Sequence, residues 1–191
     1  VEGLREAVAG AFDREWFVRG YTDEGRPIGG YAEEMLFLNA QTWAVIGGVA
    51  DPERAKLAMD AVEEHLLKDH GPLLFTPAYS VPDERVGYLT RYAPGVRENG
   101  GVYTHAATWA IQAACMVGRA KTAWEIFSCL APIKRGQDPE HYAVEPYVTP
   151  GNVEGPESPN FGRGGWSWYT GSAAWLRRVC VEWIIGVRPD W

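Results

Sequence analysis

The sequence predicts an all-α fold in which helical hairpins form about half of an (α/α)6 toroid, with long loops at one end. Trp43, Trp109 and Trp175 recur at equal spacings of 66 residues, each in a similar local sequence. The first two are followed by segments that open with Arg54 and Arg119 in an Arg-Ala-Lys sequence. Equal periods of helix, short turn, helix and long loop indicate stacked helical hairpins. A closed toroid uses such long loops to build a pocket at one end, whereas an open stack of hairpins does not need them.

The N-terminal half contains the signals for three helices. The first, from about residue 2 to residue 12, carries Leu4 and Val8 at helical spacing. A turn-rich stretch follows, and a second helix is expected from about residue 40 to residue 49. Asp51 then caps a third helix with Pro52 at its first position. The apolar face of this third helix is predicted to contain Ala55, Ala58, Val62 and Leu66.

The C-terminal half alternates long loops with helices. Residues 71–101 are rich in Pro, Gly and Tyr and predict a long loop with short strands, a kind of segment that is usually functional. A helix pair is expected at about 106–117 and 121–130, separated by Gly118. A second long loop covers residues 131–168. The last helix is expected from about 172 to 185, ending at Gly186 with Pro189 beyond it.

Composition excludes several classes of protein. A net charge of -7 argues against a binder of nucleic-acid backbones, which needs clustered Lys and Arg. The sequence has no apolar run long enough to span a membrane and no signal peptide, so no membrane partner is expected. Cys115, Cys129 and Cys180 lie in apolar helical stretches and predict reduced thiols, hence a cytoplasmic location. Nine Trp and nine Tyr suit stacking on sugar rings, although most of them are expected in the core.

Two Gly-rich segments that lead into helices are the candidate sites. Residues 97–105 hold an Arg, a Glu, an Asn and a His around two glycines, and residues 162–172 join glycines and aromatics to a helix start. Helix N-termini bind phosphate readily because their first N–H groups are unpaired. His105 and Thr170 lie one repeat period apart, so they are expected to face one anion from neighbouring hairpins. The four histidines have no partners at metal-ligand spacing, and no metal is predicted.

The same segments resemble glycoside hydrolase family 94, which includes cellobiose, cellodextrin, laminaribiose and chitobiose phosphorylases and the C-terminal part of cyclic β-1,2-glucan synthases. The resemblance runs in order along nearly the whole chain, so residues 1–191 are identified as a single domain, the C-terminal portion of a catalytic (α/α)6 barrel. It rests on Asn39–Val45, Gly95–His105, Glu145–Val148, Gly164–Trp175 and Gly186–Trp191.

The resemblance implies an inverting β-glycoside phosphorylase, which cleaves a β-linked di- or oligosaccharide with inorganic phosphate to give a sugar 1-phosphate. Phosphate is then a co-substrate, and no cofactor is expected. By the same resemblance His105, Thr170 and the N–H of Gly171 bind phosphate, and Glu145 shapes the same loop. The residues implied to line the sugar subsites are Arg97, Glu98, Tyr103 and Trp168.

The sequence departs from the family at one point, which leaves alternatives open. The family's general acid is an Asp in a Trp-Asn-Asp type motif that is absent here, so no catalytic residue is assigned and the acid is expected upstream. The chain is therefore expected to be a fragment that forms a homodimer or associates with the rest of the barrel. The alternatives are a non-catalytic carbohydrate-binding or structural fragment, a member that processes β-1,2-glucan, and a hydrolase, which would need a carboxylate base in place of His105 and Thr170.

Overall fold

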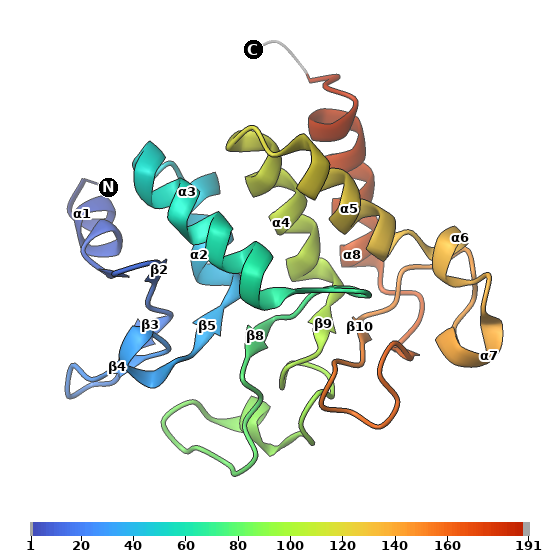
Figure 1. The fold of residues 1–191 in the computed structure, drawn as a ribbon, viewed down its shortest axis with the longest axis horizontal. Helices are drawn as coiled ribbons and strands as arrows, with labels where there is room; N and C mark the ends of the chain where they lie inside the picture. The colour runs from blue at the N-terminus through green and yellow to red at the C-terminus, as the bar shows by residue number, and fades with distance from the viewer. Residues whose placement is uncertain (1, 189–191) are drawn as a thin grey trace.

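Helical hairpins form the framework of the protein in a computed structural model that describes residues 2–188 (Figure 1). The predicted helices are present within a few residues of their expected bounds. The α-helices are α1 (Glu2–Ala9), α2 (Leu38–Ile46), α3 (Pro52–Ala61), α4 (Thr104–Met116), α5 (Ala120–Leu130), α6 (Pro132–Arg135), α7 (Pro139–Tyr142) and α8 (Thr170–Val179). Single helical turns are η1 (Tyr31–Glu33), η2 (Val62–Leu66), η3 (Tyr88–Arg91) and η4 (Cys180–Ile184).

The strands are all two residues long and form small antiparallel ladders. They are β1 (Phe12–Asp13), β2 (Trp16–Phe17), β3 (Gly20–Tyr21), β4 (Pro27–Ile28), β5 (Leu36–Phe37), β6 (Leu67–Lys68), β7 (Gly71–Pro72), β8 (Phe75–Thr76), β9 (Val102–Tyr103), β10 (Asn152–Val153) and β11 (Gly164–Gly165). The pairs are β1–β2, β3–β4, β5–β8 and β6–β7, with one three-stranded order β11–β10–β9. Strands β5, β8, β9 and β10 gather at the lower end of the helices in Figure 1. The long loops therefore leave from one end of the bundle, as the sequence predicts.

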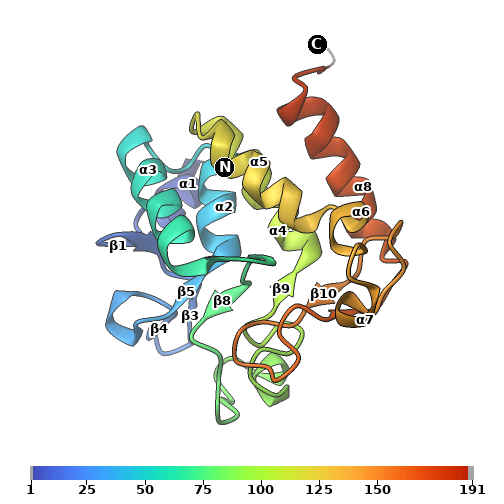
Figure 2. The same cartoon turned by 45° about the vertical axis from the view of Figure 1, so that its right-hand side comes forward.

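The repeated tryptophans form a row along three neighbouring helices. Helix α4 packs between α2 and α8, and α3 and α5 lie against α2 and α4 (Figures 1 and 2). The ring of Trp109 on α4 is 5.2 Å from that of Trp43 on α2 and 6.0 Å from that of Trp175 on α8, both edge to face. Equivalent residues of successive repeats are thus in contact, which confirms the predicted repeat.

Small residues allow the central helix to approach its neighbours closely. On α4 the fully buried positions include Ala107, Ala110 and Ala113, with Ile111 filling the space between helices. Larger apolar side chains from the third predicted helix, Met59 and Leu66, are also completely buried. Burial of this kind supplies most of the free energy that holds short helices together, because isolated helices of this length are marginal in water.

The second helix of the first hairpin begins with the predicted cap. The side chain of Asp51 accepts a hydrogen bond of 2.9 Å from the backbone N–H of Arg54, and Pro52 occupies the first turn of α3. Residues Ala55, Ala58, Val62 and Leu66 are buried as predicted. The chain then widens into the π-type turn η2, and the helical stretch ends at Leu66.

The structure differs from the predicted pattern in two places. The predicted loop at 131–168 contains the one-turn helices α6 and α7, which begin at Pro132 and Pro139 and are too short to show an apolar period. The first helix ends at Ala9 rather than near residue 12, because Phe12 pairs with Phe17 in β1–β2. The last helical stretch ends at Ile184 in η4, just before the predicted stop at Gly186, whose φ is +84°. The predicted role of Pro189 lies outside the described residues.

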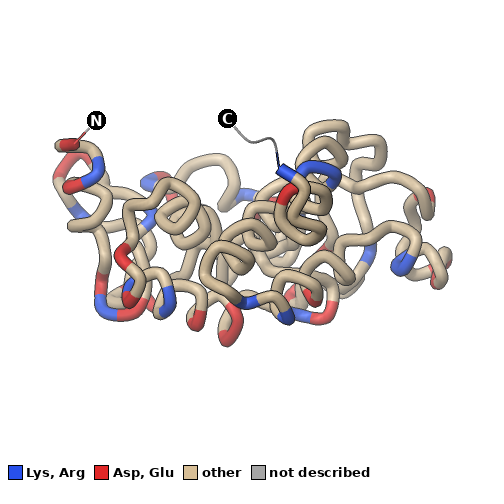
Figure 3. The backbone as a smooth tube through the Cα atoms, turned by 90° about the horizontal axis from the view of Figure 1, so that it is seen from above, with Lys and Arg blue, Asp and Glu red and all other residues tan. Residues whose placement is uncertain are grey.

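Basic and acidic residues are interspersed along the backbone (Figure 3). Arg119, before α5, pairs with Asp60 and Glu63 of the neighbouring hairpin at 2.6 Å each. Because this cluster joins consecutive hairpins, it helps to fix how they align with each other. Its charges also favour the solubility of the protein. Within residues 2–188, no helix combines the length and apolar character that crossing a bilayer requires.

Candidate functional site

A short three-stranded ladder brings the two Gly-rich segments to one rim of the helical bundle. Strand β10 pairs on one side with β9, with Asn152 opposite Tyr103, and on the other with β11, with Asn152 opposite Gly165. Strand β9 runs directly into α4, and β11 leads through residues 166–169 into α8. The N-termini of α4 and α8 therefore lie side by side, as the repeat spacing of His105 and Thr170 predicts.

His105 lies directly against Gly171 at this rim. A Cβ atom added to Gly171 would be 3.2 Å from Nδ1 of His105, closer than most real contacts. A glycine here allows the imidazole to approach the first turn of α8. The residue before α8, Tyr169, gives no side-chain cap, so the first-turn N–H groups of Thr170 and Gly171 have no capping side chain. An imidazole and an uncapped helix N-terminus together form a place suited to an anion.

In the part of the chain that the structure describes, three buried polar atoms at the rim have no hydrogen-bond partner. They are Nε2 of His105, Oγ1 of Thr104 and Oε2 of Glu98. Buried polar groups in native proteins are nearly always paired, and exceptions call for a ligand, a water or a functional role. The rings of Trp109 and Trp175 flank the imidazole at 5.0 and 6.2 Å and hold it in place. The unsatisfied atoms therefore mark the rim as a candidate functional site.

Burial lowers the pKa of His105 below its ordinary value because desolvation disfavours the charged imidazole. A lowered folded-state pKa stabilises the protein above about pH 6.5, and that stabilisation is lost as the pH falls through the folded-state value. We therefore expect the free energy of unfolding to decrease as the pH falls below about 6.5. The variant His105→Gln lacks this imidazole, so its free energy of unfolding should decrease less as the pH falls. The remaining decrease comes from His70, whose pKa is also lowered mainly by desolvation. Urea denaturation at a series of pH values measures the free energy of unfolding of the parent chain and of His105→Gln. The same dependence of that free energy on pH in both proteins would contradict the prediction.

The loop at 92–99 holds Arg97 between two aromatic rings. Its guanidinium carbon lies 3.5 Å from the ring centre of Trp166 and 4.5 Å from that of Tyr92. Its Nε is 3.6 Å from a carboxylate oxygen of Glu98. Both Arg97 and Trp166 have a left-handed backbone, with φ of +54° and +55°. Non-glycine residues with a left-handed backbone are uncommon and cluster at functional sites. The contact of Arg97 with Trp166 therefore depends on the particular backbone conformation of these two loops.

A pair of tyrosines joins the sugar-side loops to the helix starts. The hydroxyls of Tyr103 and Tyr169 are 3.1 Å apart and share one hydrogen bond. Burial, and then the bond to Tyr169, raises the pKa of Tyr103 well above its ordinary value, so its hydroxyl stays protonated at neutral pH. The charge of Glu98 acts in the same direction. Tyr103 therefore offers a neutral hydroxyl next to the carboxylate of Glu98.

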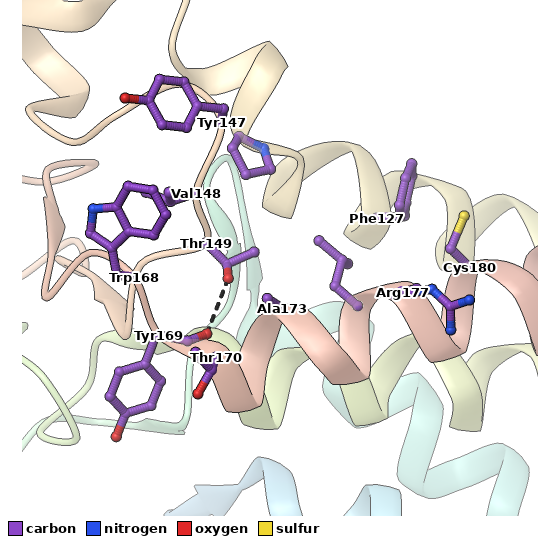
Figure 4. Close-up of a pocket in the computed structure, with 12 residues that line it drawn as sticks. Phe127, Tyr147, Val148, Thr149, Trp168, Tyr169, Thr170, Ala173, Arg177 and Cys180 are labelled. Atoms are coloured by element: carbon purple, nitrogen blue, oxygen red, sulfur yellow. Dashed lines mark hydrogen bonds between the residues drawn. The ribbon is translucent and has the colours of Figure 1, made fainter.

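Trp168 lies beside an apolar cavity of about 460 Å³ that His105 does not line (Figure 4). The Trp168 side chain is 64% exposed, and its Nε1 donates a hydrogen bond of 3.1 Å to Glu145. The cavity lies between α5 and α8 and includes Thr170 at one end but not His105. Figure 4 shows Tyr147 and Trp168 on the same side of this cavity, and their rings are 6.0 Å apart. Glu145 thus fixes the indole ring, in agreement with its expected role in shaping this loop.

The structure places the predicted residues in two groups. His105 and Gly171 are in contact with Thr170 adjacent, and Arg97, Glu98 and Tyr103 lie together near them, whereas Trp168 borders the separate cavity. The sequence interpretation missed Trp166 and Tyr169. Tyr169 stands 66 residues after Tyr103, so the tryptophan period contained the signal that would have identified it.

Comparison with known proteins identifies related sequences. The profile of the Glycosyl hydrolase 94 superfamily, catalytic domain, matches residues 1–186. The chain is 43% identical over 196 residues to the cyclic beta-(1,2)-glucan synthase NdvB of Rhizobium meliloti (strain 1021), covering 98% of this chain and 7% of that protein. It is 35% identical over 191 residues to the solabiose phosphorylase of Paenibacillus borealis, covering 98% of this chain and 25% of that enzyme.

A third relative has a similar level of identity. The chain is 34% identical over 175 residues to the N,N'-diacetylchitobiose phosphorylase of Vibrio proteolyticus, covering 91% of this chain and 22% of that enzyme. The chain therefore spans a quarter or less of the length of each of these relatives.

Proposed function

The chain belongs to the glycosyl hydrolase 94 superfamily, and on this premise we propose that it supplies the phosphate and sugar contacts of an inverting β-glycoside phosphorylase. Residues 1–191 form the C-terminal portion of the catalytic barrel in this proposal. The observation that carries it is the contact of His105 with Gly171 at the uncapped start of α8. This arrangement offers an imidazole, a hydroxyl and backbone N–H groups to one anion. An enzyme that uses phosphate as its nucleophile needs such donors to bind the phosphate.

The proposed reaction follows from what these donors do. A phosphate oxygen bonds to the anomeric carbon from the face opposite the leaving sugar, while the bond from that carbon to the glycosidic oxygen breaks. The glycosidic oxygen takes a proton from a carboxylic acid that we place outside residues 1–191. Phosphate is already charged, so no base is needed and no cofactor is involved. His105, Thr170 and the N–H of Gly171 hold the phosphate and orient it for attack.

The loop residues are proposed to hold the sugar. Arg97 is fixed between Tyr92 and Trp166, and its ion pair with Glu98 keeps both polar groups at the rim. The carboxylate of Glu98, whose side chain is 27% exposed, accepts a sugar hydroxyl, and the protonated hydroxyl of Tyr103 supplies a further contact. A transition state with oxocarbenium character gains from such hydroxyl contacts, which strengthen as charge develops on the ring. Trp168 provides an exposed indole face for a more distant sugar unit.

A β-1,2-linked glucan is the second candidate substrate. The identity of 43% to a cyclic beta-(1,2)-glucan synthase, against 35% to solabiose phosphorylase, favours it. This candidate keeps the same phosphate pocket and changes only the linkage and the acceptor. A hydrolase on the same framework would need a carboxylate base at the pocket, and His105 with Thr170 favours phosphate instead.

Phosphorolysis of a substrate panel tests the proposal. The complete enzyme that carries this segment is incubated with inorganic phosphate and β-linked glucose and N-acetylglucosamine disaccharides, including sophorose for the 1,2-linkage. We expect α-sugar 1-phosphate from the complete enzyme and none from residues 1–191 alone, which lack the acid. Release of free sugar without phosphate consumption would indicate a hydrolase. Absence of any product would favour a non-catalytic carbohydrate-binding or structural role.

We also expect the isolated chain to associate, either as a homodimer or with the rest of the barrel. Leu4 and Val8 are exposed on α1, Trp43 is 42% exposed on α2, and these side chains line an apolar groove at one edge of the bundle. The cavity between α5 and α8 is a second apolar surface, at the opposite edge of the bundle. Exposed apolar surfaces of this kind drive association. Light scattering on residues 1–191 checks this, and a monomer across the micromolar range would contradict it.

The cellular location stays a prediction. Cys115, Cys129 and Cys180 are free thiols in the described part of the chain. Burial raises the pKa of the Cys115 and Cys129 thiols, which keeps them protonated and unreactive. This pattern supports the proposal of a cytoplasmic enzyme.

A further inference from the structure

A second cluster of basic groups lies outside the proposed phosphate pocket. His70 lies in the turn between β6 and β7, His141 lies on α7, and Gly162 precedes β11. Nε2 of His70 and Nε2 of His141 are each 2.5 Å from the position that a Cβ atom of Gly162 would occupy. The two nitrogens therefore converge above the same glycine, whose φ of +91° also disfavours any other residue.

These imidazoles open on a cavity of about 260 Å³ with a basic lining. Two permanent cations, Lys134 and Arg135, face it together with the amide of Gln137. The single carboxylate of the lining, Asp138, already accepts a hydrogen bond of 3.2 Å from the backbone N–H of His141 as the cap of α7. The cavity thus offers nitrogen donors from several side chains and little competing negative charge.

Two features show how the basic groups are held in place. Nε of Arg135 donates a hydrogen bond of 2.9 Å to the carbonyl oxygen of Cys129, and its Nη2 donates to that of Asp69. The guanidinium is therefore fixed by neutral carbonyls, not by a carboxylate. Nδ1 of His70 is buried without a hydrogen-bond partner, and the ring packs edge to face on Phe161 at 4.8 Å.

The electrostatics of His70 fit an anion site. Desolvation, then the charges of Arg135 and His141, lowers the pKa of His70, while the carboxylate of Asp69 acts in the opposite direction. A bound anion would offset the positive charges of Arg135 and His141 and would favour protonation of the His70 ring. Anion binding should therefore strengthen as the pH falls. Two neutral imidazoles also bind transition metals, but Lys134 and Arg135 oppose a cation here. Within residues 2–188, no three His, Cys, Asp or Glu side chains group to hold a metal ion.

We propose that the cavity formed by His70, Lys134, Arg135, Gln137 and His141 binds a small oxyanion of the phosphate class, either free phosphate or the phosphate group of a sugar phosphate. It shares no residue with the pocket at His105, Thr170 and Gly171. An anion bound there would tie α7 to the turn at His70 and to the loop at Gly162, which leads through β11 to Thr170. The inference does not rest on the proposed phosphorylase activity.

Imidazole nitrogen NMR tests the proposal, because the chain has four histidines. Long-range proton–nitrogen spectra of the chain are recorded at pH 6.5 during titration with inorganic phosphate, with chloride added to constant ionic strength. We expect saturable shifts of the His70 and His141 signals. Lys134→Ala is expected to raise the dissociation constant at least threefold. Lys121→Ala, which removes an exposed lysine of α5 outside the cavity, should leave it unchanged.

Further arms separate the possible results. His105→Ala should leave the His70 and His141 titrations intact, so failure of the proposed catalytic pocket does not affect this test. Equal shifts with a hexose 1-phosphate identify the phosphate group as the recognised feature, and shifts with free phosphate alone identify the inorganic ion. Shifts no larger than those with chloride overturn the proposal. Zn²⁺ binding at His70 and His141 without any response to phosphate also overturns it.

Discussion

His105→Ala in the complete enzyme is expected to lower kcat/KM for phosphate by roughly 10- to 100-fold, mainly through a higher KM for phosphate. A hydrogen bond to a charged partner contributes about 1.5–3 kcal/mol, and about 1.4 kcal/mol corresponds to a factor of ten. The imidazole lies against Gly171 and is held between Trp109 and Trp175, so no neighbouring side chain replaces it. Initial rates across a phosphate series measure the effect.

A matched variant separates a local effect from a general loss of structure. His65→Ala removes a histidine that packs edge to face against Trp16 at 6.0 Å, away from the rim. We expect it to keep the KM for phosphate of the parent enzyme. If His105→Ala also keeps that KM, the assignment of His105 to the phosphate pocket is wrong.

Asn99→Ala is expected to lower the free energy of unfolding by about 2–5 kcal/mol, the range for breaking a buried hydrogen-bond network. Asn99 is completely buried. Its Oδ1 accepts a bond of 2.8 Å from the N–H of Tyr79, and its Nδ2 donates to the carbonyls of Tyr79 and Tyr92 at 2.9 and 2.7 Å. Removing the amide leaves three partly buried backbone groups without partners, which is costly.

Urea denaturation of the chain measures this loss, with Asn160→Ala as the control because Asn160 is exposed and its side chain is bonded to no other residue in the described structure. The same change should loosen the loop that carries Arg97 and Glu98, so the KM for the disaccharide in the complete enzyme should rise as well. A change below about 0.5 kcal/mol, the usual size for surface positions, would show that Asn99 does not hold this loop.

The sequence was sufficient for the framework because helical signals are local. The repeat of Trp43, Trp109 and Trp175 gave the three neighbouring helices, and Asp51 with Pro52 gave the start of α3. The same signal, an Asp followed by Pro, stands at Asp138 and Pro139 before α7. It was missed because a single turn buries too few apolar residues to show a helical period.

The site was predictable only where it follows the repeat. The contact of His105 with Gly171 follows from their spacing of one period, as does the pair of Tyr103 and Tyr169. The position of Arg97 over Trp166 depends on left-handed backbone at both residues, which no local pattern of a non-glycine residue indicates. Convergence of His70 and His141 depends on how two long loops fold against each other, and periodicity carries no information about that.

Phosphate binding by His105, Thr170 and Gly171 is tested most directly by locating a heavy oxyanion in a crystal of the complete enzyme. Tungstate has the shape of phosphate, and its anomalous scattering locates it without ambiguity. We expect a peak between the imidazole of His105 and the N–H of Gly171, within hydrogen-bond distance of the hydroxyl of Thr170. A peak in the cavity at His70 and His141 would support the second site but would not replace the first. An empty rim at His105 under saturating tungstate would contradict the account.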